Sequence, residues 1–358
     1  MKTDSLMETL TGLYRSCGYR NYRMSKFEKY ELYAGHKDFL VSDRVITFND
    51  TNGDLLALKP DVTLSIVRST DDHLARKQKV CYCESVYRPA GSEQRFREIT
   101  QCGLECIGDL DGYDSYEVLN LAGESLRLIS RDSILSVSHL GIVKSLLQAL
   151  HADEPVQKRF LNLLAERNLH ELSALFQEQG WSRELFQDVK RLLFLSCPLR
   201  DLSVRLEEWQ LSWLEKNCLL ELKELSELMT ETDEFTVFDF SVINDIHYYN
   251  GIVFQGFVNG ISEKVLAGGR YDSLLRHMNR AGCAIGFAVY FGLLEQLNQY
   301  DKQADADVLV LYDEQTPLTV VRDTVHQLRA RGKSASAQRC AEGVYTETVD
   351  LRGGKVHA

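Results

Sequence analysis

Residues 80–108, VCYCESVYRPAGSEQRFREITQCGLECIG, constrain the fold of this chain more than any other stretch. They alternate in the manner of two β-strands joined by a polar loop that contains glycine. In the second strand Gln101, Gly103 and Glu105 follow one another at a spacing of two, so their side chains project from one face of a sheet. We therefore predict a strand pair that carries an amide and a carboxylate on one face, with room above Gly103.

This strand pair permits two interpretations. An ordinary half-exposed hairpin also turns polar side chains toward solvent, and the stretch by itself favours that interpretation. The alternative is a pocket for a small zwitterion, to which Arg88 at the end of the first strand contributes. Other parts of the chain decide between the two.

Length and composition indicate an ordinary globular protein. The 358 residues suffice for one large domain and one or two small ones, and 44% of them are hydrophobic. The formal net charge is −11, and no dense block of lysine and arginine is present, which disfavours nucleic acid as the main partner. No apolar run reaches the length of a membrane span and no signal peptide is recognised, so we predict a soluble, cytoplasmic protein.

The 9 cysteines are predicted to be reduced thiols. Cys81 and Cys83 could face Cys102 and Cys106 across the strand pair, which raises the question of a metal site. Their spacing is not that of a zinc site, and the last two should point away from the polar face. We predict small buried thiols and no metal.

The first 75 residues contain the next candidate site. Residues 19–33 alternate like a strand, and a hairpin with the turn NDTNGD follows. In the motif LKPDVT, Asp61 and Thr63 precede the helix that LSIVR begins. They either cap this helix or face the ammonium group of a ligand.

The remaining chain divides into a helical segment and a second group of motifs. Residues 154–232 are rich in leucine and charge at helical spacing, which predicts an inserted helical module. After it come the pair Tyr248 and Tyr249 and the pair Gly268 and Gly269. A glycine pair is often only a turn, but it also allows the backbone to approach a ligand closely.

Four stretches stand in one order: LKPDVT, then YR…REITQCGLECIGD, then HYYNGIVFQG with AGGRYD, then AIGFAV. This series resembles the catalytic core of histidyl-tRNA synthetase and, more closely, its truncated paralogue, the regulatory subunit of ATP phosphoribosyltransferase. The resemblance implies an α+β class II synthetase-like core at residues 1–300, with an antiparallel sheet flanked by helices that is usually dimeric. It implies a short α/β segment at residues 305–358, similar to a truncated anticodon-binding domain.

The resemblance also implies a histidine site. Asp61, Thr63 and Gln101 match positions that hold the α-amino group of histidine. Glu105 and Tyr249 match positions that read the two imidazole nitrogens. The predicted set is completed by Arg88, which matches an arginine that binds the ATP α-phosphate in synthetases, by Tyr248, and by the backbone of Gly268 and Gly269.

Departures from the synthetase pattern indicate that no residue is catalytic. Asn244 and Leu293 stand where synthetases carry arginines for adenylate formation, and His247 replaces an aspartate before the paired tyrosines. Ser25 stands where the first class II motif usually has proline. We expect a regulatory subunit without a cofactor, which binds L-histidine and conveys feedback control to the short-form catalytic subunit. A divergent histidyl-tRNA synthetase is the alternative, and a paralogue that binds tRNA without charging it is the least favoured.

Overall fold

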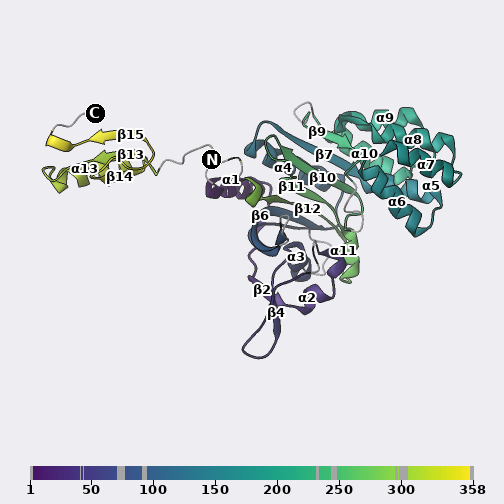
Figure 1. Ribbon diagram of the computed structural model, residues 1–358, viewed down its shortest axis with the longest axis horizontal. Coiled ribbons are helices and arrows are strands. Elements are labelled where there is room, and N and C mark those ends of the chain that lie inside the picture. The colour runs from purple at the N-terminus through teal and green to yellow at the C-terminus, as the bar shows by residue number, and fades with distance from the viewer. Residues whose placement is uncertain are drawn as a thin grey trace. The chain divides into compact units, whose positions relative to one another are not determined.

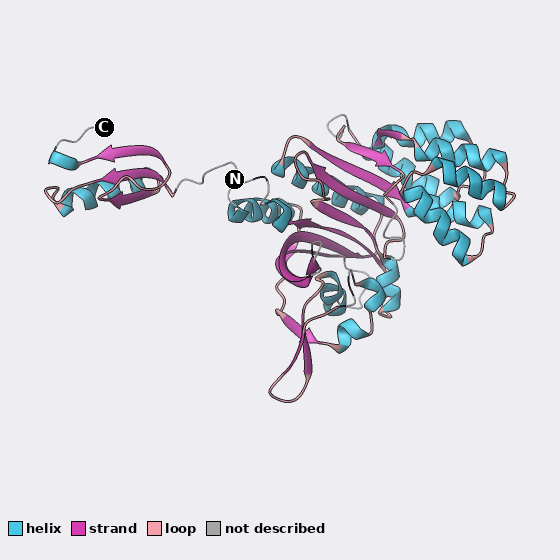
Figure 2. Cartoon of the chain, in the orientation of Figure 1, coloured by secondary structure: helices cyan, strands magenta, loops and turns pink. Residues whose placement is uncertain are grey.

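The computed structural model describes residues 3–40, 42, 44–70, 77–90, 95–230, 234–242, 248–294, 297 and 305–354. The chain forms two compact units, Thr3–Gln296 and Leu297–Ala358 (Figures 1 and 2). The first contains every predicted site residue.

A nine-stranded sheet forms the centre of the first unit. In spatial order its strands are β1 (Arg20–Asn21), β5 (Gln78–Ala90), β6 (Arg95–Gly108), β12 (Cys283–Tyr290), β11 (Leu266–Arg270), β10 (Ile252–Val258), β7 (Ser133–His139), β9 (Thr236–Asp239) and β8 (Ser196–Pro198). The six strands from β5 to β7 pair with one another in antiparallel orientation. At the two sides of this group, β1 pairs with β5 in parallel and β9 pairs with β7 in parallel. The predicted antiparallel sheet is confirmed, and β5 and β6 are the predicted strand pair.

Two long helices, α1 (Thr3–Ser16) and α4 (Gly112–Ile129), pack against one face of this sheet. Apolar residues at helical spacing line one side of α1, and this side is buried. The hydroxyl of Tyr14 lies 2.9 Å from Ser125 Oγ, which joins the two helices through a buried polar contact. This face is therefore closed by helices.

Shorter elements cover the opposite face. They are α3 (Thr63–Ser69), α11 (Asp272–His277), α2 (Glu31–Ala34), the 3₁₀ helix Lys37–Phe39 and a small antiparallel sheet of β2 (Phe27–Lys29), β4 (Leu55–Leu58) and β3 (Thr47–Asn49). The prediction that residues 19–33 alternate as a strand is largely wrong, because only Arg20–Asn21 and Phe27–Lys29 are strands and α2 begins at Glu31. Leu32 and Tyr33 are adjacent and both buried in one core, which a helical turn permits and a strand does not.

A helical segment follows α5 (Leu140–Leu150). It comprises α6 (Glu154–Ala165), α7 (Leu169–Glu178), α8 (Arg183–Leu193), the 3₁₀ helix Leu199–Asp201, α9 (Leu202–Trp209) and α10 (Lys216–Leu228). Side-chain oxygens of Asp153, Asn168 and Ser182 accept hydrogen bonds from backbone N–H groups at the starts of α6, α7 and α8. The short strand β8 within this segment was not predicted from the sequence.

The second unit is a small α/β fold with a three-stranded parallel sheet in the order β14 (Ala335–Gln338), β13 (Ala306–Leu311), β15 (Tyr345–Asp350). The helix α13 (Leu318–Ala330) connects β13 to β14, and the 3₁₀ helix Arg352–Gly354 follows β15. Its core contains Val310, Val321 and Leu351.

Candidate functional site

Glu105 lies on β6, on the face that α3 covers, and its side chain is buried. The Thr63 hydroxyl donates a hydrogen bond to Glu105 Oε1 at 2.8 Å, and the Tyr271 hydroxyl donates to Oε2 at 2.6 Å. Burial raises the pKa of Glu105 to about 8, although these two hydrogen bonds lower it. A carboxyl group protonated near neutral pH can donate a hydrogen bond to a ligand as well as accept one.

Glycines leave the space that this carboxylate occupies. A Cβ atom at Gly286 on β12, which is paired with Glu105, would lie 1.8 Å from Glu105 Oε2. A Cβ atom at Gly103 would lie 2.1 Å from the carbonyl oxygen of Phe287 and 2.8 Å from the Tyr82 hydroxyl. The prediction of room above Gly103 is therefore wrong, because the side chain of Tyr82 fills that space.

Asp61 serves as a helix cap at the start of α3. Its Oδ1 atom accepts a hydrogen bond from the Leu64 N–H at 2.9 Å. Burial raises the pKa of Asp61, while the positive charge of Arg88 lowers it. The side chain is half-buried rather than closed off. Capping therefore engages one carboxylate oxygen, and the capping interpretation does not exclude contact with a ligand.

Gln101 and Arg88 lie near Tyr290 of β12. Gln101 is buried and its Cα is paired with that of Tyr290. The guanidinium carbon of Arg88 lies 6.0 Å from the centre of the Tyr290 ring, within the range of a cation–π contact. The positive charge of Arg88 also lowers the pKa of Asp61, so the two side chains interact electrostatically.

The paired tyrosines stand beside these groups. The Tyr248 and Tyr249 ring centres lie 4.7 Å apart with the rings nearly perpendicular, and Tyr248 lies 5.8 Å from the Tyr271 ring. Burial raises the pKa of Tyr248 well above its usual range, and the charges of Asp61 and Glu105 add to this effect. Tyr248 thus joins the two carboxyl groups into one cluster.

The glycine pair lies inside strand β11 rather than in a turn. A Cβ atom at Gly269 would lie 2.8 Å from Cδ1 of Tyr249, and one at Gly268 would lie 2.4 Å from the Gly286 carbonyl oxygen. Gly269 therefore makes room for the Tyr249 ring, and Gly268 for the neighbouring strand.

Sequence reasoning missed Tyr271 and Tyr82. Tyr271 follows Gly269 at a spacing of two, so alternation along β11 was a usable signal. Tyr82 is paired with Gly103 across the strand pair, and that register could have indicated it. Both are buried, with pKa values raised well above the usual range by burial and then by the charge of Glu105.

The arrangement combines two carboxyl groups, a threonine, a glutamine and an aromatic wall of tyrosines. Carboxylate and neutral oxygens suit a primary ammonium group. A buried acid beside tyrosines suits a ring that both donates and accepts hydrogen bonds, or a cationic ring. The cluster therefore has the chemistry to bind a small zwitterion with a polar ring.

The described part of the chain contains no group of three or more His, Cys, Asp and Glu residues that could hold a metal ion. Cys102 points toward α1, where its Sγ lies 3.9 Å from Thr11 Oγ1, away from the polar face. Likewise, no described helix is long and apolar enough to cross a membrane.

A family model described as histidyl-tRNA synthetase matches residues 1–294. The chain belongs to the histidyl-tRNA synthetase family. Within this family it is similar to the ATP phosphoribosyltransferase regulatory subunit of Oceanobacillus iheyensis, at 26% identity over 293 residues. This match covers 80% of the chain and 72% of that relative. The predicted resemblance to such regulatory subunits is confirmed.

Solved structures agree on the fold of this family member. A regulatory subunit/histidyl-tRNA synthetase from Bacillus halodurans matches with a TM-score of 0.77 at 24% identity, over 98% of this chain and 94% of that one. A chain of an ATP phosphoribosyl transferase complex from Thermotoga maritima matches with a TM-score of 0.63 at 20% identity, over 80% and 96% respectively. The predicted class II synthetase-like fold is confirmed.

Proposed function

We propose that the chain is a non-catalytic regulatory subunit of ATP phosphoribosyltransferase that binds L-histidine at the Glu105 cluster. The observation that carries this proposal is a buried glutamic acid with a pKa of about 8, held by Thr63 and Tyr271 beside Tyr248. The names of similar proteins support the regulatory role, and the similar chain from an ATP phosphoribosyl transferase complex supports assembly with a catalytic subunit. We propose that this partner is the short-form catalytic subunit. The complex is proposed to convey feedback control by histidine, with this chain dimeric through its class II-like core.

Each proposed contact keeps the assignment that the family resemblance implies, and the chemistry of histidine is consistent with it. Asp61, Thr63 and Gln101 bind the α-ammonium group. Glu105 and Tyr249 bind the two imidazole nitrogens. The rings of Tyr248 and Tyr249 line one side, with Gly269 making room beneath Tyr249. Arg88 supplies a cation near the Tyr290 side of the cluster, where it can meet the ligand carboxylate.

The proposal excludes adenylate formation by the chain. Leu293 is half-buried in α12 (Phe291–Leu294) and offers no charge to a triphosphate. Asn244 and His247, two further departures, lie outside the described residues. Removal of one donor to a developing negative charge costs about 3 kcal/mol, so the loss of two arginines leaves no useful rate.

Calorimetric titration of L-histidine into the full chain, without ATP, tests the ligand. The expected result is binding whose affinity is nearly constant between about pH 6.5 and pH 8. In that window the imidazole of free histidine is neutral and the Glu105 carboxyl carries one proton. The bound carboxyl and imidazole share this same proton, so binding neither takes up nor releases one. Above about pH 8 binding must be accompanied by uptake of a proton, and below about pH 6.5 by release of one. The affinity therefore falls about tenfold per pH unit on both sides of the window. An affinity that keeps rising above pH 8 contradicts the role of Glu105.

The match to the histidyl-tRNA synthetase family favours one second candidate, a divergent synthetase. Histidine-dependent exchange of pyrophosphate into ATP distinguishes the two functions, because it requires adenylate formation. We expect no exchange above the level of a sample without enzyme. Exchange at the rate of an ordinary synthetase would show that the departures at Asn244 and Leu293 are compensated elsewhere. The net charge of −11 disfavours a third candidate, a paralogue that binds tRNA without charging it.

A further inference from the structure

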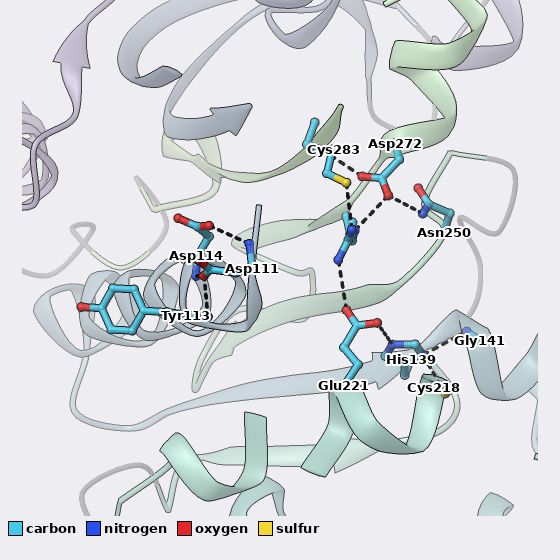
Figure 3. Close-up of polar contacts among 12 residues, drawn as sticks. Asp111, Tyr113, Asp114, His139, Gly141, Cys218, Glu221, Asn250, Asp272 and Cys283 are labelled. Atoms are coloured by element: carbon cyan, nitrogen blue, oxygen red, sulfur yellow. Dashed lines mark hydrogen bonds and ion pairs between the residues drawn. The ribbon is translucent and has the colours of Figure 1, made fainter. Parts of the chain in front are cut away.

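A chain of polar contacts leads from the helical segment to the predicted site. Arg270, the last residue of β11, donates from Nη1 to Glu221 Oε1 on α10 at 3.4 Å and from Nε to Asp272 Oδ2 at 2.9 Å. Its Nη2 atom lies 3.0 Å from the Cys283 sulfur. Figure 3 shows Glu221, His139 and Cys218 at one end of this chain and Asp272, Asn250 and Cys283 at the other. One arginine therefore joins α10 to the sheet.

Glu221 is fixed at its second oxygen as well. His139 Nδ1 accepts a hydrogen bond from the Gly141 N–H at 3.1 Å, which leaves the ring proton on Nε2. That nitrogen lies 3.2 Å from Glu221 Oε2, and Cys218 Sγ of α10 lies 3.2 Å from Nδ1. The carboxylate of Glu221 thus bridges the end of β7 and the end of β11, and its side chain is only 26% exposed.

At the other end, the same residues hold the backbone that follows Tyr249. The Asn250 N–H donates to the Arg270 carbonyl oxygen at 2.8 Å, and Asn250 Nδ2 donates to Asp272 Oδ2 at 3.1 Å. Ser273 Oγ donates to the Tyr248 carbonyl oxygen at 2.9 Å. The position of both tyrosines therefore depends on where Arg270 and Asp272 lie.

We propose that Glu221 is a positioning residue through which the helical segment fixes the Tyr248 and Tyr249 backbone, by way of Arg270 and Asp272. The Glu221 side chain contacts His139 and Arg270, neither of which is assigned to the proposed ligand. A change of α10 is transmitted to the tyrosines, and a ligand that moves the tyrosines acts on α10 with the same coupling free energy. The helical segment is thereby part of the regulatory machinery rather than an inert insertion.

Hydrogen exchange on the full chain, followed by mass spectrometry, tests this proposal without any ligand. Glu221→Gln keeps the shape of the side chain and removes its charge. We expect faster exchange in peptides that contain the amides of Asn250, Ser273 and Ala284. These amides donate to Arg270, Asn250 and Asp272 respectively, which belong to the network of contacts that begins at Glu221. Exchange that changes only within α10 would show a local structural role and overturn the proposal.

Trp213→Phe is the matched control. It removes the 3.0 Å hydrogen bond from Trp213 Nε1 to Asp188 Oδ2 inside the same helical segment and touches no member of the network. Its exchange at residues 248–252 and 270–274 should equal that of the wild type. If both variants accelerate exchange there equally, the effect is general loosening of the segment and the proposal is wrong.

L-Histidine titration adds a second readout, which rests on the proposed function. Glu221→Gln should weaken binding on the order of tenfold, while Trp213→Phe should leave it unchanged. If the wild type binds no L-histidine but exchange responds as expected, the proposed ligand fails and the positioning role of Glu221 stands. If the wild type binds and Glu221→Gln neither weakens binding nor changes exchange, the positioning role fails alone.

Discussion

Glu105→Gln is expected to stabilise the folded chain, by an amount that grows with pH. The native state binds the Glu105 proton with a pKa of about 8, against an ordinary value of 4.5, because burial disfavours the charged form. The stability that this carboxyl contributes is fully present below about pH 4.5 and is lost as pH rises to about 8. The loss amounts to about 1.4 kcal/mol per pH unit within this window. Glutamine resembles the protonated acid and removes the loss.

The free energy of unfolding is measured by urea titration at intervals from pH 5 to pH 9. Tryptophan fluorescence is a suitable signal, because all 3 tryptophans lie in the helical segment of the first unit. Glu8→Gln, on the exposed side of α1, is the control and should run parallel to the wild type. If the free energy of unfolding of Glu105→Gln also changes with pH as that of the wild type does, Glu105 is ionised throughout this range. The proposal that Glu105 supplies the proton shared with histidine is then wrong.

Alternation along the long strand β6 was the dependable part of the sequence analysis, whereas alternation at residues 19–33 misled it. Gln101 and Glu105 are both buried in β6, and Glu105 meets Thr63 of α3 as a shared polar cluster requires. The Gly268 and Gly269 pair was ambiguous because a glycine pair suits a turn as well as a strand. The structure resolves the ambiguity, since the Tyr249 ring and a neighbouring carbonyl oxygen occupy the space above them.

Contacts between distant strands could not be predicted in the same way. Tyr271 reaches Glu105 only because β12 lies between β11 and β6 and sets their registers. No local pattern encodes that order, which depends on how the whole sheet assembles. The link from Glu221 to Arg270 was hidden for the same reason, because it joins a helical segment that looked like a solvated insertion to the end of a strand.

Gly286→Ala is expected to cause a large loss of stability. The new methyl carbon would lie 1.8 Å from Glu105 Oε2 and 2.4 Å from the Leu104 carbonyl oxygen. Neighbouring strands hold β6 on both sides, so its backbone cannot move away without breaking pairs. Overpacking typically costs about 1–3 kcal/mol, and approaches as close as these put Gly286→Ala at about the upper end of that range. Glu105 should also leave Thr63 and Tyr271, so histidine binding should be lost in any molecules that fold.

Urea unfolding at pH 7 measures this loss, and Gly12→Ala is its control. Gly12 lies on the exposed side of α1 with no atom within 4 Å of an added methyl group, so alanine there should stabilise the chain by about 0.5–1 kcal/mol. Combining Gly286→Ala with Glu105→Ala separates the two clashes. The single Glu105→Ala variant completes the cycle, because loss of the carboxyl alters stability by itself. The coupling free energy between the two substitutions measures the clash with the carboxylate, and the loss that Gly286→Ala still causes in the Glu105→Ala background measures the clash with the Leu104 backbone. A Gly286→Ala variant as stable as the wild type would mean that Glu105 does not lie against this glycine, and the geometry proposed for the histidine site would be wrong with it.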